Sequence, residues 1–320
     1  MPRKHSGHKG ELFLCCHSDL FGIPLEEGCW TSQHDKEGYL QVKNYNLKFK
    51  IILFPIFTFL IFNFAFLSFP TPVHPFMSDT EIAVFQKEIA NKPVGDRIAL
   101  WAEKFIGTPY DPDPLGEYVT KKAIVADERV DCMYLSFRAV ELALSLTPDK
   151  AIDIALDKRF ITKGRLDSKG NVINYEDRFQ YGEDMLDSGR WGKEITEQLG
   201  KVTDIKGSRG RKKVKVISKR EMLKVLNKKG DSSPLKSGDF IFFIKAVERR
   251  RAGEIVGHIG IVKTEVSSQR SAVSKNEEQK EIYLIHAGGF KKKGGEVTKV
   301  RLYDYINSMP FIGMRVSRIN

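Results

Sequence analysis

Beyond residue 75 the chain holds one cysteine, Cys132, and two histidines, His258 and His286. A thiolate is a strong nucleophile and an imidazole is its usual base, so these residue types indicate cysteine-dependent catalysis. Asp131 and Cys132 stand at the predicted start of a helix, where unpaired backbone amides and the helix dipole stabilise a thiolate. The alternative for a lone cysteine is a buried thiol with a purely structural role.

The two histidines lie in predicted strands. His258 belongs to the sequence VGHIGIVK, where Gly257 and Gly260 should leave space beside the ring for a substrate. His286 ends the sequence IYLIH, and alternate residues of a strand share a face. If the two strands pair, the imidazoles come close together and one can orient the other, as in a nucleophile–base–orienter triad. A satisfied core histidine is the alternative at each position.

A thiolate and two imidazoles could also bind zinc. Cys132, His258 and His286 would supply three ligands, but no acidic motif that could complete the site lies nearby. The sequence also contains no CxxC pair of the metal-binding type and no glycine-rich phosphate loop. We therefore expect no metal and no cofactor.

Two helical stretches precede the strands. Ser78–Gly107 shows apolar residues at three- and four-residue spacing, with a break at Lys92-Pro93. The second helix begins at Cys132, with Asp131 as its N-cap, and its stop is marked by Thr147-Pro148. The apolar surface of this helix is so broad that we expect it to be buried in the core.

The C-terminal third is rich in short predicted strands. Helices first and strands afterwards predict an α+β domain with an antiparallel sheet over residues 78–320. The predicted strands are Asp239–Lys245, Val256–Lys263, Ile282–His286, Val300–Tyr303 and Met314–Ser317. Before them, Lys201–Arg220 is strongly basic. We interpret this stretch as a solvated loop, with a polyanion-binding patch as the alternative.

The 320-residue chain has a formal net charge of +11, which suits an anionic partner such as a cell-wall polymer, a membrane surface or nucleic acid. Ile51–Phe69 carries no charge, follows several lysines and is nearly long enough to cross a bilayer. We predict that residues 51–69 are a signal anchor or signal peptide. Residues 1–50 are then a polar leader, which is a cytoplasmic tail or reflects a start codon assigned too early.

The residues after this hydrophobic run, FPTPVHPF, contain no small-x-small cleavage site, which favours an uncleaved anchor. We therefore expect a membrane-anchored or secreted protein in the periplasm or otherwise outside the cytoplasm. The membrane is its expected partner through residues 51–69, and nucleic acid is not.

Five short motifs occur along the chain in a fixed order. They are GTPY at Gly107–Tyr110, DC at Asp131-Cys132, GDFIFF at Gly238–Phe243, GHIGIV at Gly257–Val262 and LIHA at Leu284–Ala287. In this order they resemble the motifs of NlpC-type, papain-like cell-wall cysteine hydrolases. The long spacer between Cys132 and His258 and the stretch Arg178–Gly200 resemble a narrower branch, the N-acetylmuramoyl-L-alanine amidase-like proteins.

This resemblance implies a papain-like NlpC-type fold in which the nucleophile helix packs on an antiparallel β-sheet. It also implies that Cys132 attacks an amide, that His258 is the base and that His286 orients the base. Tyr110 is implied to lie near the nucleophile, and we expect Tyr110 and Asp131 to contact the substrate.

The chain departs from the pattern of this family at three places. Met133 stands where a small Ser or Thr is usual, and Gly288 replaces a small hydroxyl residue after the HA pair. The insertion Glu265–Lys280 lengthens the spacing between His258 and His286. The first two departures bear on contacts with the substrate, and the third bears on the role of His286.

The predicted function is hydrolysis of peptidoglycan or its muropeptide fragments. The Cys132 thiolate would cleave the amide between N-acetylmuramic acid and L-alanine. The choice of this bond rests on the resemblance to the amidase-like branch alone. One alternative is an endopeptidase that cuts γ-D-glutamyl bonds of the stem peptide. Another is a non-catalytic wall- or membrane-binding module with Lys201–Arg220 as its anchor, in which Cys132 is dispensable.

Overall fold

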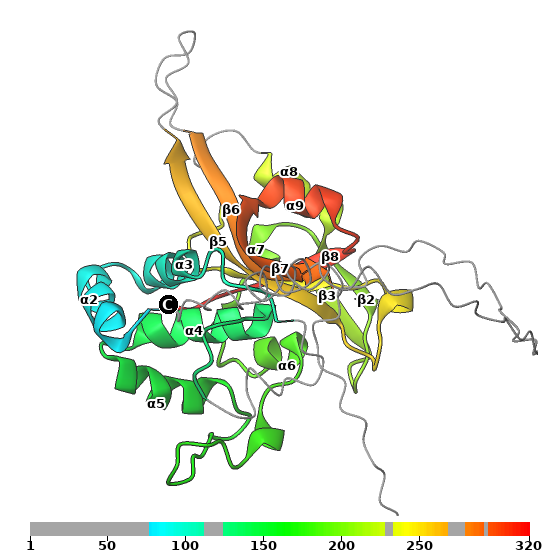
Figure 1. Ribbon diagram of the computed structural model, residues 1–320. Helices are drawn as coiled ribbons and strands as arrows, with labels where there is room; N and C mark the ends of the chain where they lie inside the picture. Colours follow the sequence, from blue (N-terminus) through cyan, green and yellow to red (C-terminus); the bar gives the residue numbers. More distant parts are fainter. Residues whose placement is uncertain (1–76, 112–123, 228–232, 268–278, 291–293) are drawn as a thin grey trace, which may run out of the picture. The chain divides into compact units, whose positions relative to one another are not determined.

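The computed structural model describes residues 77–111, 124–227, 233–267, 279–290 and 294–320 (Figure 1). The predicted leader at residues 1–50 and the hydrophobic run at residues 51–69 lie outside this part of the chain. Within the described ranges, no helix has the length and apolar character needed to cross a membrane.

The described residues form an α+β structure built on one antiparallel sheet, as the order of predicted elements indicates. The strand order is β2-β3-β8-β4-β5-β6-β7, and the short strand β1 pairs with β8. The strands are β1 Lys193–Glu194, β2 Val202–Lys206, β3 Lys213–Ser218, β4 Phe240–Ile244, β5 Val256–Ser267, β6 Gln279–Phe290, β7 Gly294–Arg301 and β8 Gly313–Arg318.

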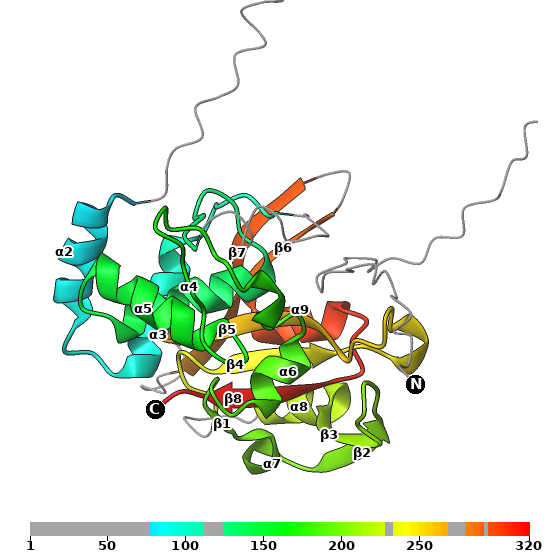
Figure 2. The same cartoon turned by 90° about the horizontal axis from the view of Figure 1, so that it is seen from below.

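Helices cover both faces of this sheet (Figures 1 and 2). The helices are α2 Asp79–Ile89, α3 Val94–Lys104, α4 Cys132–Leu144, α5 Pro148–Lys158, α6 Gly182–Asp187, α7 Thr196–Leu199, α8 Lys219–Leu226 and α9 Leu302–Ser308. α3, α4 and α6 contact β5, α9 contacts β6 and β7, and α7 and α8 contact β3 and β8. Two short 3₁₀ turns, Tyr175–Asp177 and Val247–Arg249, lie in connecting segments.

The N-terminal helices begin where their sequence predicts. Ser78 caps α2 in a capping box with Glu81, and α3 starts directly after Pro93. α4 starts at Cys132, and nearly all of its residues are buried, which confirms the expected core helix. α4 ends at Leu144, before the predicted stop, and Thr147 instead caps α5 by accepting a hydrogen bond from the Lys150 amide.

The side chains of the central strands alternate between two hydrophobic clusters, one on each face of the sheet. Phe240, Phe242 and Ile244 of β4 belong to the cluster that contains α2, α3 and α4. Ile241 and Phe243 belong to the cluster that contains α8 and α9. Because β4 contributes side chains to both clusters, its sequence FIFFI is continuously apolar, as expected for a strand buried on both sides.

The basic stretch Lys201–Arg220 is not a solvated loop, contrary to our interpretation. It forms the hairpin of β2 and β3 and then enters α8. In β3 the buried Val214 and Val216 alternate with exposed lysines, which is the pattern of a half-buried strand. The charge of the lysines conceals this short alternation in the sequence.

The predicted strand Val300–Tyr303 is only partly correct. β7 already ends at Arg301, and α9 begins at Leu302. Leu302, Tyr305 and Ile306 have helical three- and four-residue spacing and are all buried. This helix is too short for its period to be distinguished in the sequence from that of a strand.

Candidate active site

Cys132 is the first residue of α4, as its predicted position requires. The Asp131 carboxylate accepts a hydrogen bond from the Tyr134 amide at 2.6 Å and so caps the helix. Cys132 is 2% exposed, and α4 packs against β5 and β6, the strands that carry the two histidines. The fold therefore packs the helix that begins with this thiol against the two strands that carry the imidazoles.

The two histidines contact each other directly. β5 and β6 pair in antiparallel register, with Ile261 opposite Ile285. Nε2 of His258 lies 3.1 Å from Nδ1 of His286, and the ring planes are nearly perpendicular, at 84°. Such a contact is a hydrogen bond in which one nitrogen donates and the other accepts. It leaves Nδ1 of His258 as the ring nitrogen available for another partner.

Aromatic side chains surround this imidazole pair. The Tyr305 ring lies 4.6 Å from the His286 ring, between ring centroids. The Phe311 ring is nearly parallel to the His258 ring, at a centroid distance of 6.5 Å. Phe243, opposite His258 in the β4–β5 register, contacts both Tyr305 and Phe311. The histidines therefore face the hydrophobic cluster under α9, while their strand neighbours Ile259 and Ile285 pack in the cluster that contains Cys132.

This environment keeps both rings neutral near pH 7. Burial lowers the pKa of His258 well below its usual value, and the neighbouring His286 lowers it further. Burial also lowers the pKa of His286 to about 4. Within the described residues, no carboxylate forms a hydrogen bond or ion pair with either ring. A neutral imidazole can accept a proton, which is the state that a general base needs.

The glycines beside His258 do not provide the open space that the sequence suggested. A side chain at Gly260 would overlap Leu284 of β6, with a Cβ to Cδ1 distance of 2.6 Å. A side chain at Gly257 would overlap the aliphatic part of Lys245 at similar distances. The glycines therefore serve close packing around β5.

The start of β5 is held by α6. The Glu183 carboxylate accepts hydrogen bonds from the amides of Ile255 and Val256, both at 3.1 Å. A side chain at Gly182 would overlap Val256, so this glycine lets α6 lie directly on the strand. His258 follows two residues later, and its backbone position thus depends on this contact.

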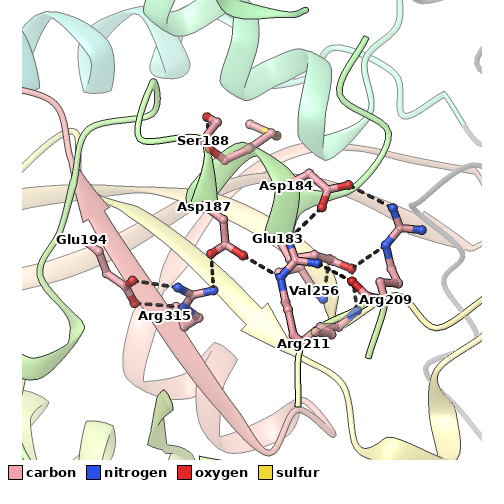
Figure 3. A network of polar contacts seen from close by, with 11 residues as sticks. Glu183, Asp184, Asp187, Ser188, Glu194, Arg209, Arg211, Val256 and Arg315 are labelled. Carbon is pink, nitrogen blue, oxygen red and sulfur yellow. Dashed lines mark hydrogen bonds and ion pairs between the residues drawn. The ribbon is translucent and has the colours of Figure 1, made fainter. Parts of the chain in front are cut away.

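Figure 3 shows how α6 is held in turn by arginines. Arg211 bridges Asp184 and Asp187 at 2.9 and 2.6 Å, and Arg209 reaches Asp184 at 3.0 Å. Both arginines belong to the turn between β2 and β3. Part of the basic stretch therefore has an intramolecular role in docking the hairpin onto α6. This role is not predictable from the sequence, because the sequence does not show which acidic residues the arginines contact.

Tyr110 connects the segment before Cys132 with the β6–β7 hairpin. Its amide donates to the Gly295 carbonyl at 2.8 Å, and its backbone bridges Val130, two residues before the nucleophile. Tyr110 is 7% exposed, and its ring lies where a side chain at Gly289 would be. These contacts bring the start of α4 close to the end of β6, just beyond His286.

Among the described residues, the two histidines are hydrogen-bonded to each other, and the Cys132 thiol is not part of this hydrogen-bonded pair. No hydrogen bond links Cys132 Sγ to either ring in the described part of the chain. The same residues contain no group of three or more His, Cys, Asp or Glu side chains with a metal-binding arrangement, so Cys132, His258 and His286 do not form the three-ligand cluster of the zinc alternative.

No family model matches the chain, and no curated protein matches it by sequence. Solved structures align with much of its length. A Legionella pneumophila protein of the family DUF1460 is 14% identical, with a TM-score of 0.52, over 74% of this chain and 93% of that chain. An N-acetylmuramoyl-L-alanine amidase from Bacteroides uniformis is 18% identical, with a TM-score of 0.48, over 70% of this chain and 97% of that chain. The first likeness shows that this chain and the Legionella protein share a fold.

Proposed function

We propose that the protein is a cysteine-dependent hydrolase of peptidoglycan or muropeptides that cleaves the amide between N-acetylmuramic acid and L-alanine. The observation that carries this proposal is the neutral pair of His258 and His286, hydrogen-bonded at 3.1 Å on the strands against which the Cys132 helix packs. A nucleophile, a base and a group that orients the base define acyl-transfer sites. The choice of bond follows from the motif resemblance.

In the first step, Cys132 Sγ attacks the carbonyl carbon and its proton moves to Nδ1 of His258. Nδ1 receives the proton because Nε2 is already bonded to His286. The backbone amide of Cys132 stabilises the negative charge on the tetrahedral oxygen. His258 then passes the proton to the nitrogen of L-alanine, the C–N bond breaks and a thioester forms. His258 next takes a proton from water, the hydroxide attacks the thioester, and the thiol is restored.

This mechanism requires Sγ of Cys132 to come within hydrogen-bond reach of His258 Nδ1 in the substrate complex. Both rings face the cluster that contains α9, on the other face of the sheet from α4, so Sγ would have to approach Nδ1 around the end of β6. A first-turn helical side chain points back toward the helix N-terminus. For Cys132 this direction leads toward Tyr110 and the end of β6, where the contacts of the Tyr110 backbone bring these segments together.

We further propose that residues 51–69 hold the chain at a membrane, with the residues after Phe69 outside the cytoplasm. The uncharged run and the lysines before it support this proposal. In native cells we expect the protein in the membrane fraction, with the described residues accessible to external protease. Recovery of the full-length chain in the cytoplasmic fraction would contradict it.

The catalytic proposal is tested with defined muropeptides and mass spectrometry of the products. We expect free L-alanyl peptide and an intact disaccharide from the wild type, and no product from Cys132→Ser, with an unchanged circular dichroism spectrum. Products cut after D-glutamate would instead identify the endopeptidase. Full activity of Cys132→Ser would overturn the cysteine mechanism, and activity lost with EDTA and restored by zinc would replace it with a metal mechanism.

A further inference from the structure

We propose that Thr298 is a positioning residue that fixes the proton arrangement of the two histidines; this inference rests on the proposed function. Thr298 lies on β7, directly opposite His286 in the β6–β7 register. Its Oγ1 is 3.4 Å from Nε2 of His286, while Nδ1 of the same ring bonds His258. The side chains thus form one line from His258 through His286 to Thr298.

The proton count along this line decides the role of the hydroxyl. When His258 has taken the thiol proton, both of its nitrogens carry hydrogen, so Nε2 must donate to Nδ1 of His286. A neutral imidazole has one N–H, and that hydrogen on His286 must then be on Nε2. Thr298 Oγ1 is the group placed to accept it. The charged state of His258 therefore permits a single direction of hydrogen bonding.

The opposite direction would disable the base. If Thr298 donates to Nε2 of His286, then Nδ1 of His286 donates to His258, whose own hydrogen moves to Nδ1. Nδ1 could then not accept the thiol proton. A hydroxyl that accepts from His286 thus favours the productive arrangement. Because its hydrogen bond matters most when charge develops on His258, it stabilises the transition state more than the ground state.

A neutral hydroxyl fits this place better than a carboxylate would. Aromatic rings lie beside the two imidazoles, and no carboxylate among the described residues contributes to the pKa shift of either ring. A carboxylate would favour imidazolium in the resting enzyme, whereas a hydroxyl orients the rings and leaves them neutral. Threonine is also β-branched, which restricts its χ1 and holds Oγ1 in a fixed direction on the strand.

The experiment compares Thr298→Val, which keeps the shape and removes the hydroxyl, with Thr298→Ser, which keeps the hydroxyl. We expect Thr298→Val to lower kcat about tenfold with little change in KM, and Thr298→Ser to stay within about threefold of wild type. Thr203→Val, the same change on the exposed face of β2, serves as the control and should match wild type. Equal kcat values for all four proteins would overturn the inference.

A second measurement separates positioning from a general loss of structure. ¹⁵N-NMR of histidine-labelled Cys132→Ala protein at pH 7 should show Nε2 of His286 protonated and Nδ1 unprotonated. Thr298→Val in this background should shift His286 toward the other tautomer, and Thr298→Ser should not. An unchanged tautomer in Thr298→Val would overturn the role of Thr298 even if activity fell. A shifted tautomer in a protein whose Cys132→Ser variant stays active would leave this inference standing and refute the proposed function.

Discussion

Two sets of buried ionisable side chains in this protein differ in whether an opposite charge lies beside them. One is the ion network along α4, formed by Asp127, Arg138, Glu141 and Arg159, and the other is the pair of His258 and His286. In the network, Glu141 is fully buried and binds Arg159 through both carboxylate oxygens, at 2.6 and 2.7 Å. The histidine pair has a hydrogen bond but no counter-charge within the described residues.

The difference appears in the protonation states. In the network, burial is the largest effect and disfavours the charge of Arg159, but the charge and hydrogen bonds of Glu141, together with Tyr134, outweigh it and raise the pKa of the guanidinium. In the pair, burial acts without compensation and lowers the pKa of both rings. Fixed opposite charges thus stabilise a structure, whereas an uncompensated imidazole stays neutral and ready to accept a proton. Four predictions test this contrast, beginning with the largest effect.

Removal of the proposed base should affect turnover far more than folding. We expect His258→Ala to lower kcat/KM on a defined muropeptide by about 10³-fold or more. Among the described residues, His286 is the one other imidazole at the site, and it is proposed to orient the base. His286→Asn keeps a polar group in the orienting position and should retain measurable turnover. Phe311→Leu, which alters the ring beside His258, is the matched control and should stay near wild type. Similar losses in all three variants would mean that packing, not chemistry, explains the pair.

Removal of a charge from the network should affect folding and leave the chemistry intact. We expect Glu141→Gln to lower the free energy of unfolding by about 3–5 kcal/mol, because Arg159 then stays buried without its counter-ion. Urea unfolding measures this change. Lys150→Ala breaks the exposed pair with Asp153 and is the control, with no shift of the midpoint expected. A Glu141→Gln variant as stable as the control would show that the network is not electrostatically essential.

As the pH falls, the histidine pair should lower the stability of the folded protein before the carboxylates become protonated. The unfolded His286 ring takes up a proton near pH 6.5, and the folded ring does so only near 4. The unfolded state therefore binds more protons in this window, and stability falls as the pH falls from 6.5 to 4. At about 1.4 kcal/mol per pH unit, the loss from His286 reaches about 3 kcal/mol. The depressed pKa of His258 acts in the same direction.

Urea unfolding at several pH values between 7 and 4.5 measures this loss. His286→Asn lacks the titrating ring and should give a flatter profile than wild type. Parallel profiles for the two proteins would contradict the assignment of the acid sensitivity to the pair.

The smallest predicted effect concerns the space beside His286. A Cβ at Gly288 would lie 3.1 Å from both Cε1 and Nδ1 of that ring, and Nδ1 is the atom that bonds His258. We expect Gly288→Ala to tilt the ring and to lower kcat about fivefold, which corresponds to a strain of about 1 kcal/mol. Gly294→Ala, where no atom lies near the added carbon, isolates the cost of its positive φ. If both variants are equally active, the ring tolerates a neighbour at position 288.

Local sequence signals led to much of the candidate site. Asp131 before an apolar helix predicted the N-cap and the burial of α4, because capping and helical periodicity act within a few residues. Period-2 alternation placed His258 and His286 in strands, and the structure pairs these strands. The same reasoning misread the β2–β3 hairpin and α9, which are short elements whose charge or length hides their period.

The sequence by itself therefore determined which residues begin α4, which residues lie in the central strands and which residue types are available for chemistry. The tertiary structure decided which of these groups meet. The register of β6 on β7 sets Thr298 opposite His286, the packing of α9 brings Tyr305 to the same ring, and α6 brings Glu183 to the start of β5. Helix caps and side-chain periods depend on neighbours along the chain, whereas register and packing depend on how distant side chains fit together, which no local pattern encodes.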